Sequence, residues 1–177
     1  MCIRDRSKGT LVLNNGNVIE NVLLQVDLYT NDIIASKDDG EIIYLDKRLF
    51  KEVIVSVDGT DVQYKKIDPK NPDDFYQVLY EDEGLVFFKE RYASLREASN
   101  IGMTNTNARF INRTKYYIKH GEGQIAKVKL KKKEIFSGFV DAELYAMKEY
   151  ARRKGIEFKD EADFIAVFEG VNEESAH

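Results

Sequence analysis

His120 is one of two histidines in this 177-residue chain, and Glu122 follows it in the stretch KHGEG. A histidine near a carboxylate can act as a general base or bind zinc, but both kinds of chemistry require further convergent groups. The other histidine, His177, is the terminal residue and is expected to fray. We therefore expect no histidine metal site. We interpret His120 as a surface residue of a hairpin turn, with a functional role as the alternative.

Carboxylates are plentiful in three short polar segments, DLYTND, DDGE and YEDEG. An EF-hand calcium loop requires alternating oxygen ligands and a distant bidentate glutamate, which SKDDGEIIYLD does not provide. Short acidic side chains in turns accept hydrogen bonds from nearby backbone amides. We assign that role to Asp38, Asp39 and Asp82, with a weakly bound cation at one turn as the alternative.

Motifs for nucleophilic catalysis and phosphate binding are missing from the sequence. The one cysteine is Cys2, and no apolar segment of a signal peptide precedes it. Ser137 lies in FSGF, which lacks the Gly-x-Ser-x-Gly pattern of a nucleophile elbow. The glycines of HGEGQ lie between two strand patterns, whereas a phosphate loop joins a strand to a helix. We expect no enzyme, no cofactor, and no catalytic, cofactor-binding or metal-binding residue.

The basic tract KVKLKKK, close to Tyr116 and Tyr117, could form an RNA-binding strand that combines phosphate contacts with stacking rings. The alternation of apolar and basic residues from Ala126 to Lys131 favours a simpler interpretation. The lysines then form the solvated face of an amphipathic strand. On that face we place Lys127, Lys129 and Lys131, and on the inward face Ala126, Val128 and Leu130.

Other elements must position these residues. From Thr10 to Leu130, apolar and polar residues alternate with a period of two, which predicts short antiparallel strands. Asn15-Gly16, Asp39-Gly40, Asp58-Gly59 and Gly121-Glu122-Gly123 supply tight hairpin turns. Within NVLLQVDLYT, one face holds the residues expected to be buried: Val22, Leu24, Val26 and Leu28. The two prolines predict a loop in IDPKNPDD, and Tyr76, Val78 and Tyr80 share a face of the next strand.

The last forty or so residues change to helical spacing. One helix is predicted from Asp141 as its cap to Gly155 as its stop, with an apolar stripe of Val140, Leu144, Met147 and Ala151. A second begins after Asp160, with Asp163 near its N-terminus and a stripe of Phe164, Val167, Phe168 and Val171. We expect the buried anchors to be Leu144, Met147, Phe164 and Phe168.

Together these patterns predict an α+β fold, mainly an antiparallel β meander that forms a sandwich or partial barrel, with two C-terminal α-helices. The first six residues, MCIRDR, resemble adapter sequence read as coding sequence in environmental assemblies. We therefore expect a non-native or disordered leader over 1–8 and a missing native N-terminus. An antiparallel β domain is expected over 9–131 and a helical segment, packed on or appended to the sheet, over 132–177.

The formal net charge of −4 gives no general attraction to nucleic acid or an anionic membrane. The longest apolar runs, such as Leu85–Phe88, are far shorter than the roughly 20 residues that a membrane-spanning helix needs. We expect no membrane span and consider nucleic acid an improbable partner.

Two stretches carry a resemblance: VLLQVDLYTNDII, and the tail that runs from YYIKHGEGQIAKVKLKKKEIF to YARRKGIEFKDEADFIAVFE. Together they resemble an uncharacterised family of Gram-negative bacterial proteins that are β-rich at the front, helical at the back and usually carry a signal peptide. The likeness extends over most of residues 9–172. It implies a periplasmic or envelope setting and transfers no catalytic residue.

Three functions follow as hypotheses. The first is a non-enzymatic envelope protein that binds another envelope protein through an exposed sheet face or edge and the helical tail. The alternative is a β domain that binds a small apolar ligand, and a more distant one is RNA binding through 127–133. Interaction predicts an exposed apolar or aromatic patch, whereas ligand binding predicts an enclosed cavity of roughly several hundred Å³.

Overall fold

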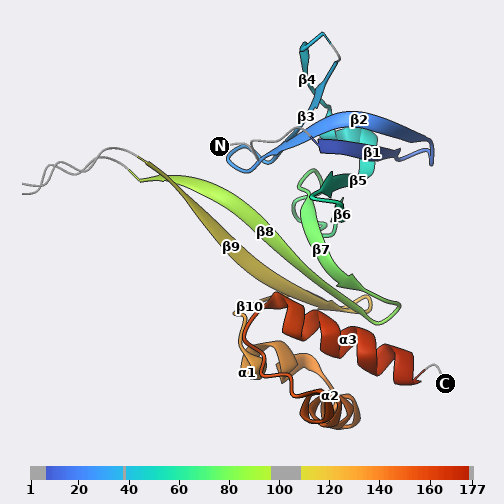
Figure 1. The fold of residues 1–177 in the computed structure, drawn as a ribbon, viewed down its shortest axis with the longest axis vertical. Coiled ribbons are helices and arrows are strands. Elements are labelled where there is room, and N and C mark those ends of the chain that lie inside the picture. Colours follow the sequence, from blue (N-terminus) through green and yellow to red (C-terminus); the bar gives the residue numbers. More distant parts are fainter. Residues whose placement is uncertain (1–6, 38, 97–108, 176–177) are drawn as a thin grey trace, which may run out of the picture. The chain divides into compact units, whose positions relative to one another are not determined.

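The computed structural model describes residues 7–37, 39–96 and 109–175. Over these residues the fold is α+β, as expected: one 10-stranded antiparallel sheet is followed by helices (Figure 1). The expectations for residues 1–6, Asp38 and His177 lie outside the described residues.

The strands are β1 (Ser7–Leu13), β2 (Val18–Asp27), β3 (Asp32–Ser36), β4 (Ile42–Tyr44), β5 (Phe50–Val57), β6 (Thr60–Lys65), β7 (Tyr76–Glu81), β8 (Leu85–Arg96), β9 (Arg109–His120) and β10 (Ile125–Val128). Their order in the sheet is β10-β9-β8-β7-β6-β5-β1-β2-β3-β4. Sequence neighbours therefore pair throughout, except that β5 pairs with β1 instead of β4. This one departure from a simple meander leaves β4 at an end of the order.

The hairpin turns form where the sequence predicts them. Gly16 and Gly40 have φ of 88°, and Asp58 and Gly59 both have positive φ, 51° and 78°. Glycine adopts this left-handed backbone without a Cβ clash, and aspartate tolerates it better than most residues. The turn chemistry of these dipeptides therefore sets the spacing of the strands.

The structural role expected for two acidic turn residues is confirmed. The Oδ1 atom of Asp39 accepts a hydrogen bond from the Glu41 amide at 2.9 Å. Asp82 Oδ1 accepts bonds from the amides of Gly84 and Leu85, each at 2.7 Å. Both carboxylates therefore hold hairpin turns in shape.

The chain divides into two compact units, which we describe separately. The first consists of Met1–Gln77 and Glu90–Thr114, and the second of Val78–Lys89 and Lys115–His177. This division differs from the expected boundary after residue 131, because parts of β7, β8 and β9 group with the helices. Residues 7 and 8, which we expected in the leader, belong to β1, which begins at Ser7.

The first unit surrounds one apolar cluster. Leu24 and Val53 are fully buried at its centre, and the residues predicted to face inward from β2 belong to it. The amide of Ala93 in β8 donates to the carbonyl of Leu28, just after β2, at 2.9 Å. The strands of this unit therefore curl around a common core, so the arrangement is a partial barrel and not a sandwich of two sheets.

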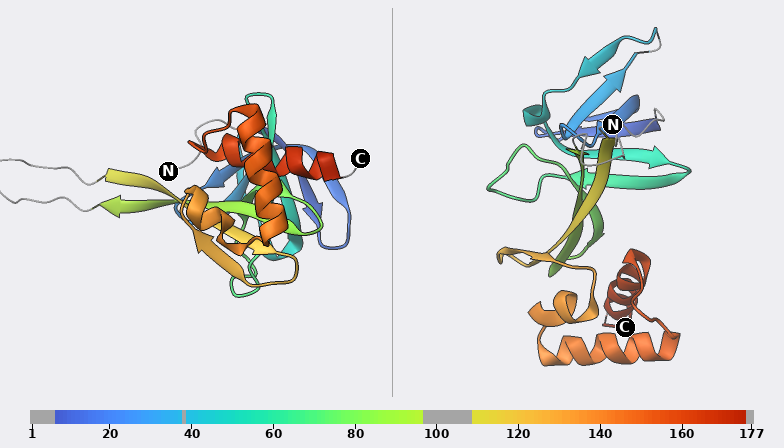
Figure 2. Two further views of the ribbon diagram at one scale, coloured as in Figure 1. Left: turned by 90° about the horizontal axis from the view of Figure 1, so that it is seen from below. Right: turned by 90° about the vertical axis from the view of Figure 1, so that its left-hand side faces the viewer.

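The second unit contains the helices α1 (Lys132–Ile135), α2 (Asp141–Lys154) and α3 (Glu161–Ser175), with the 3₁₀ helix η2 (Phe136–Gly138). Helices α2 and α3 pack against each other (Figure 2). Their apolar stripes meet strand residues such as Phe87 and Ile118 in a second cluster. Met147, Phe164 and Phe168 are buried as expected, whereas Leu144 is only half-buried.

The start of α2 differs from the prediction. Val140, expected in the apolar stripe, is 64% exposed and occupies the N-cap position that we assigned to Asp141. Its carbonyl accepts from the Leu144 amide at 2.9 Å, and its own amide donates to Glu143 Oε2 at 3.1 Å. The end of α2 is as predicted, because Gly155 adopts the left-handed C-cap with φ of 69°.

The basic tract is only partly a strand. β10 ends at Val128, and Lys132 already begins α1, so the alternation predicted through Lys131 stops early. The amide of Lys129 donates to Glu134 Oε2 at 2.9 Å, which turns the chain into the helix. The lysines of the predicted face are exposed, and Val128 and Leu130 pack on the second cluster, but Ala126 is exposed instead of inward-facing.

Among the described residues, no helix combines the length and the apolar composition required to cross a membrane.

Candidate interaction site

Strand β4 is an end strand of the sheet, and among the described strands it pairs with β3 alone (Figure 1). The Lys37 amide donates to the Glu41 carbonyl at 2.9 Å, and the Leu45 amide donates to the Ile33 carbonyl at 3.0 Å. In an antiparallel pair such bonds recur at every second residue. The N–H and C=O groups of Ile42 and Tyr44 therefore point away from β3, toward the free edge.

The side chains of the same two residues are exposed. Ile42 is 54% and Tyr44 71% accessible, whereas Ile43 between them packs against the first apolar cluster. Two cross-strand rows lead to these side chains: Leu23, Ser36 and Ile42, and Gln25, Ile34 and Tyr44. The edge thus combines outward backbone groups with two exposed apolar side chains, which suits the addition of a strand.

The hairpin between β3 and β4 keeps this edge extended. Lys37 and Glu41 form an ion pair across its turn, and the Gly40 amide donates to the Lys37 carbonyl at 2.9 Å. Both charged side chains are more than half exposed, so the pair contributes little to stability. The backbone bonds and the packing of Ile43 fix the register.

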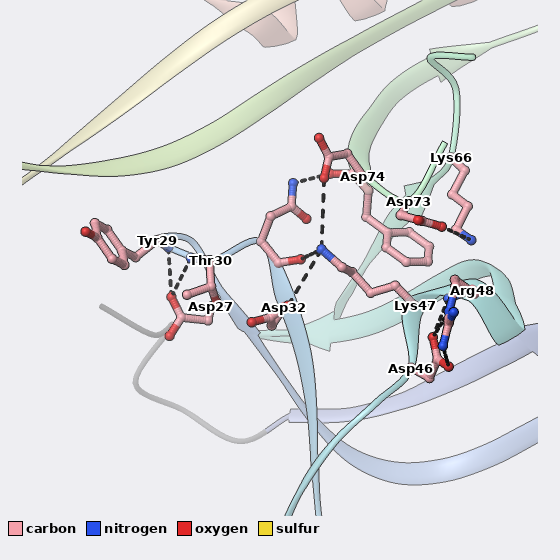
Figure 3. Close-up of polar contacts among 12 residues, drawn as sticks. Asp27, Tyr29, Thr30, Asp32, Asp46, Lys47, Arg48, Lys66, Asp73 and Asp74 are labelled. Atoms are coloured by element: carbon pink, nitrogen blue, oxygen red, sulfur yellow. Dashed lines mark hydrogen bonds and ion pairs between the residues drawn. The ribbon is translucent and has the colours of Figure 1, made fainter. Parts of the chain in front are cut away.

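A polar cluster around Lys47 holds the other end of β4 (Figure 3). Lys47 belongs to the 3₁₀ helix η1 (Lys47–Leu49), and its Nζ donates to the Asn31 carbonyl at 3.2 Å. The same ammonium lies 3.6 Å from Asp32 Oδ1 and 3.9 Å from Asp74 Oδ1. Its side chain is 21% exposed, so one cation joins three segments of the first unit.

The partners of Lys47 are themselves positioned by the local sequence. Asn31 takes the left-handed conformation at φ 57°, and its Nδ2 donates to the Phe75 carbonyl at 3.5 Å. Asp27 Oδ1 accepts from the amide of Tyr29 at 2.7 Å, which shapes the turn before Asn31 (Figure 3). The turn after β2 therefore offers its carbonyl to the lysine.

Asp46 caps η1 and fixes Arg48. Its Oδ1 accepts from the Arg48 amide at 3.1 Å, and its two oxygens accept from Arg48 Nε and Nη2 at 2.9 and 2.8 Å (Figure 3). These bonds from the guanidinium and then from the amide lower the pKa of the Asp46 carboxyl from 3.8 to about 2. The carboxyl therefore stays ionised in mild acid.

Charges in this region are already paired, which limits its chemistry. Lys47 and Arg48 hold carboxylates, and Lys66 lies 3.8 Å from Asp73 Oδ1 and 5.6 Å from the centre of the Phe75 ring. A general base or a nucleophile needs a reactive group with an open position beside it. We therefore interpret the cluster as an anchor for the β4 edge. In the described part of the chain, no group of His, Cys, Asp or Glu could hold a metal ion.

His120 occupies a different environment from the surface turn that we expected. It ends β9 and is half-buried, with its ring edge-on to Phe139 at a centroid distance of 4.6 Å. Its Nε2 is buried without a hydrogen-bond partner among the described residues and lies against Gly138, where a Cβ would come within 2.5 Å. Packing of the ring against Phe139 accounts for this position, and among the described residues no hydrogen bond joins its Nε2 to a carboxylate.

The first unit also contains a cleft of about 290 Å³. Its lining includes Lys8, Glu20 and Asp61, so it is polar and partly open. It does not have the apolar, enclosed character that the small-ligand hypothesis requires.

Sequence patterns did not single out Ile42 and Tyr44 as candidates. The signal was present in EIIYLD, an apolar run after the Asp39-Gly40 turn with no lysine or proline to guard it. Its position at the end of the sheet depends on β5 pairing with β1, which local sequence does not reveal.

Comparison of the chain with protein-family models, curated proteins and solved structures finds no match. The function must therefore be argued from the geometry.

Proposed function

We propose that this protein is a non-enzymatic interaction protein that binds an extended segment of another protein along β4. The observation that carries the proposal is the outward orientation of the backbone groups of Ile42 and Tyr44 beside their exposed side chains. Backbone hydrogen bonds would supply affinity, and the exposed side chains of Ile42 and Tyr44 would select the partner's side chains.

The partner's chemistry follows from the edge. Side chains opposite Ile42 and Tyr44 would continue two rows that already contain Leu23 and Ile34. Aromatic and β-branched pairs across strands stabilise a sheet by roughly 0.2–1 kcal/mol each. We therefore expect an extended segment with apolar residues at alternating positions and no charge between them.

The setting of this function is part of the proposal. A periplasmic or envelope location, with another envelope protein as the partner, rests on the resemblance of the two sequence stretches described above. Immunoblotting of periplasmic, membrane and cytoplasmic fractions from cells that carry the gene tests the location. Recovery of the protein in the cytoplasmic fraction would contradict it.

The interaction can be tested with a phage-displayed library of random peptides selected on the full chain. We expect the selected peptides to alternate apolar residues and to slow hydrogen exchange at the amides of Ile42 and Tyr44. Tyr44→Lys should abolish binding, because lysine on an edge disfavours strand addition. The matched control is Tyr145→Lys, a change of another exposed tyrosine, which is 69% accessible on α2.

Several results would oppose the proposal. One is peptide binding that survives Tyr44→Lys, and another is protection that leaves the β4 amides unchanged. Selection of peptides that bind the basic tract, or of no peptide at all, would also count against strand addition.

A further inference from the structure

The second unit has a cleft of about 180 Å³ that belongs to neither the β4 edge nor the Lys47 cluster. Four segments form it: the β7–β8 hairpin, the end of β9, the region around the start of α2 and the end of α3. The volume is below the roughly 300–1,000 Å³ of pockets for drug-sized molecules. It suits a compact group of a few non-hydrogen atoms.

The lining of the cleft contains two carboxylates, Asp82 and Glu143, and no lysine or arginine. His120 also lines the cleft, and its Nε2 is buried without a hydrogen-bond partner among the described residues. Glu143 Oε2 accepts from the Val140 amide, while Oε1 has no partner within the described part of the chain. The last turn of α3 also lies here and has no basic residue. The C-terminal end of a helix carries partial negative charge. The two carboxylates and this helix end therefore both favour a cation.

The lining of the cleft also contains aromatic rings. The rings of Tyr80 and Phe139 both lie beside Phe168, with centroids 5.4 and 5.9 Å from its own. Phe139 is only half-buried, so part of its ring remains accessible. The negative face of an aromatic ring attracts ammonium groups within about 6 Å. A cleft with rings and carboxylates is therefore suited to an organic cation.

A metal ion fits this cleft poorly. Asp82 Oδ1 already accepts from the amides of Gly84 and Leu85, and Oδ2 accepts from the Tyr80 hydroxyl at 2.6 Å. Calcium and magnesium require several oxygen ligands with free lone pairs. Here only the carboxylate of Glu143 has an unengaged oxygen.

We propose that this cleft binds a small organic ammonium cation, with Glu143 supplying the charge and the accessible part of the Phe139 ring supplying the contact surface. Quaternary or alkylated ammonium groups are the expected class, because they bury methyl groups while keeping their charge. The inference is independent of the proposed pairing at β4.

The test compares choline with its uncharged isostere 3,3-dimethylbutan-1-ol on the full chain. Binding is followed by backbone amide NMR shifts at Gly84, His120 and Asn172, which line the cleft. We expect saturable shifts with choline and much weaker ones with the alcohol. Equal binding of both compounds, or no saturable shift with choline, would overturn the proposal.

Glu143→Gln removes the charge but keeps an oxygen for the Val140 amide, so the helix cap is preserved. We expect it to raise the choline Kd by up to about fivefold, the effect of a partly exposed charge pair. The matched control is Glu149→Gln, the same change at a position of α2 outside the cleft. An equal effect of both variants would show a nonspecific charge effect and would also overturn the proposal.

Discussion

The two end strands of the sheet order, β4 and β10, are constructed differently. β4 exposes Ile42 and Tyr44 and contains no charged residue. β10 exposes Lys127 and a small alanine, and four further exposed lysines follow it within the next five residues. Lysine on an edge opposes pairing with another strand, because the incoming backbone must desolvate the charge. The contrast indicates that β10 is protected against strand addition, whereas β4 remains open to it.

The two edges also differ in their support. Val128 of β10 and the following Leu130 pack on the apolar cluster of the second unit. β4 depends on Ile43 and Leu45, which are partly buried, and on the polar anchor of Lys47. Apolar packing is the stronger support, so we expect β4 to open at a lower free energy than β10.

The largest effect is expected at the centre of the second cluster. Phe164 is fully buried, so Phe164→Ala should lower the free energy of unfolding by about 3–5 kcal/mol. Denaturant unfolding measures the loss, and hydrogen exchange should place it at β10 more than at β4. Tyr145→Ala, a deletion of an exposed ring, is the control and should change stability by less than about 0.5 kcal/mol. Equal losses for both variants would contradict the packing.

The polar anchor should give a smaller, local effect. Lys47→Met leaves Asp32, Asp74 and the Asn31 carbonyl without their shared donor, which should lower stability by about 1–2 kcal/mol. Exchange at the amides of Ile43 and Leu45 should accelerate. Lys51→Met, an exposed lysine of β5, serves as the control. Unchanged exchange in the Lys47 variant would mean that β4 does not depend on the anchor.

Replacing the lysines at the protected edge should hardly affect the fold. We expect the triple change of Lys127, Lys129 and Lys131 to Ser to alter stability by less than about 0.5 kcal/mol, because these side chains are exposed. Light scattering should instead detect more self-association, since the edge has lost its charges. Salt-sensitive binding of single-stranded RNA by the wild type, lost in this variant, would favour the nucleic-acid alternative.

The smallest effect concerns acid. The pKa of Asp46 is lowered to about 2, so its contribution to stability is present above its ordinary value of 3.8. That contribution is lost as the pH falls from 3.8 through about 2. NMR titration of the carboxyl carbon should give the low midpoint, and Arg48→Gln should move it back toward 3.8. A midpoint already near 3.8 in the wild type would contradict the Arg48 contact.

Much of the local structure was determined by the sequence itself. Alternation identified the buried face of β2, and Asn-Gly and Asp-Gly pairs located the hairpins, because both depend on neighbouring residues and on backbone sterics. The stripes of α2 and α3 identified Met147, Phe164 and Phe168 as buried. The Gly155 cap followed from the same local rules.

The tertiary structure decided what each surface faces. Ala126 alternates correctly yet is exposed, and His120 immediately precedes a turn yet packs on Phe139, because burial depends on which distant segment covers a residue. The candidate site shows the same limit. The apolar residues of β4 are visible in the sequence, but their position at an edge depends on the pairing of β5 with β1. Among the described strands, this pairing leaves β4 with β3 as its neighbour. Strand pairing over long sequence separation is set by the whole core and not by any local pattern.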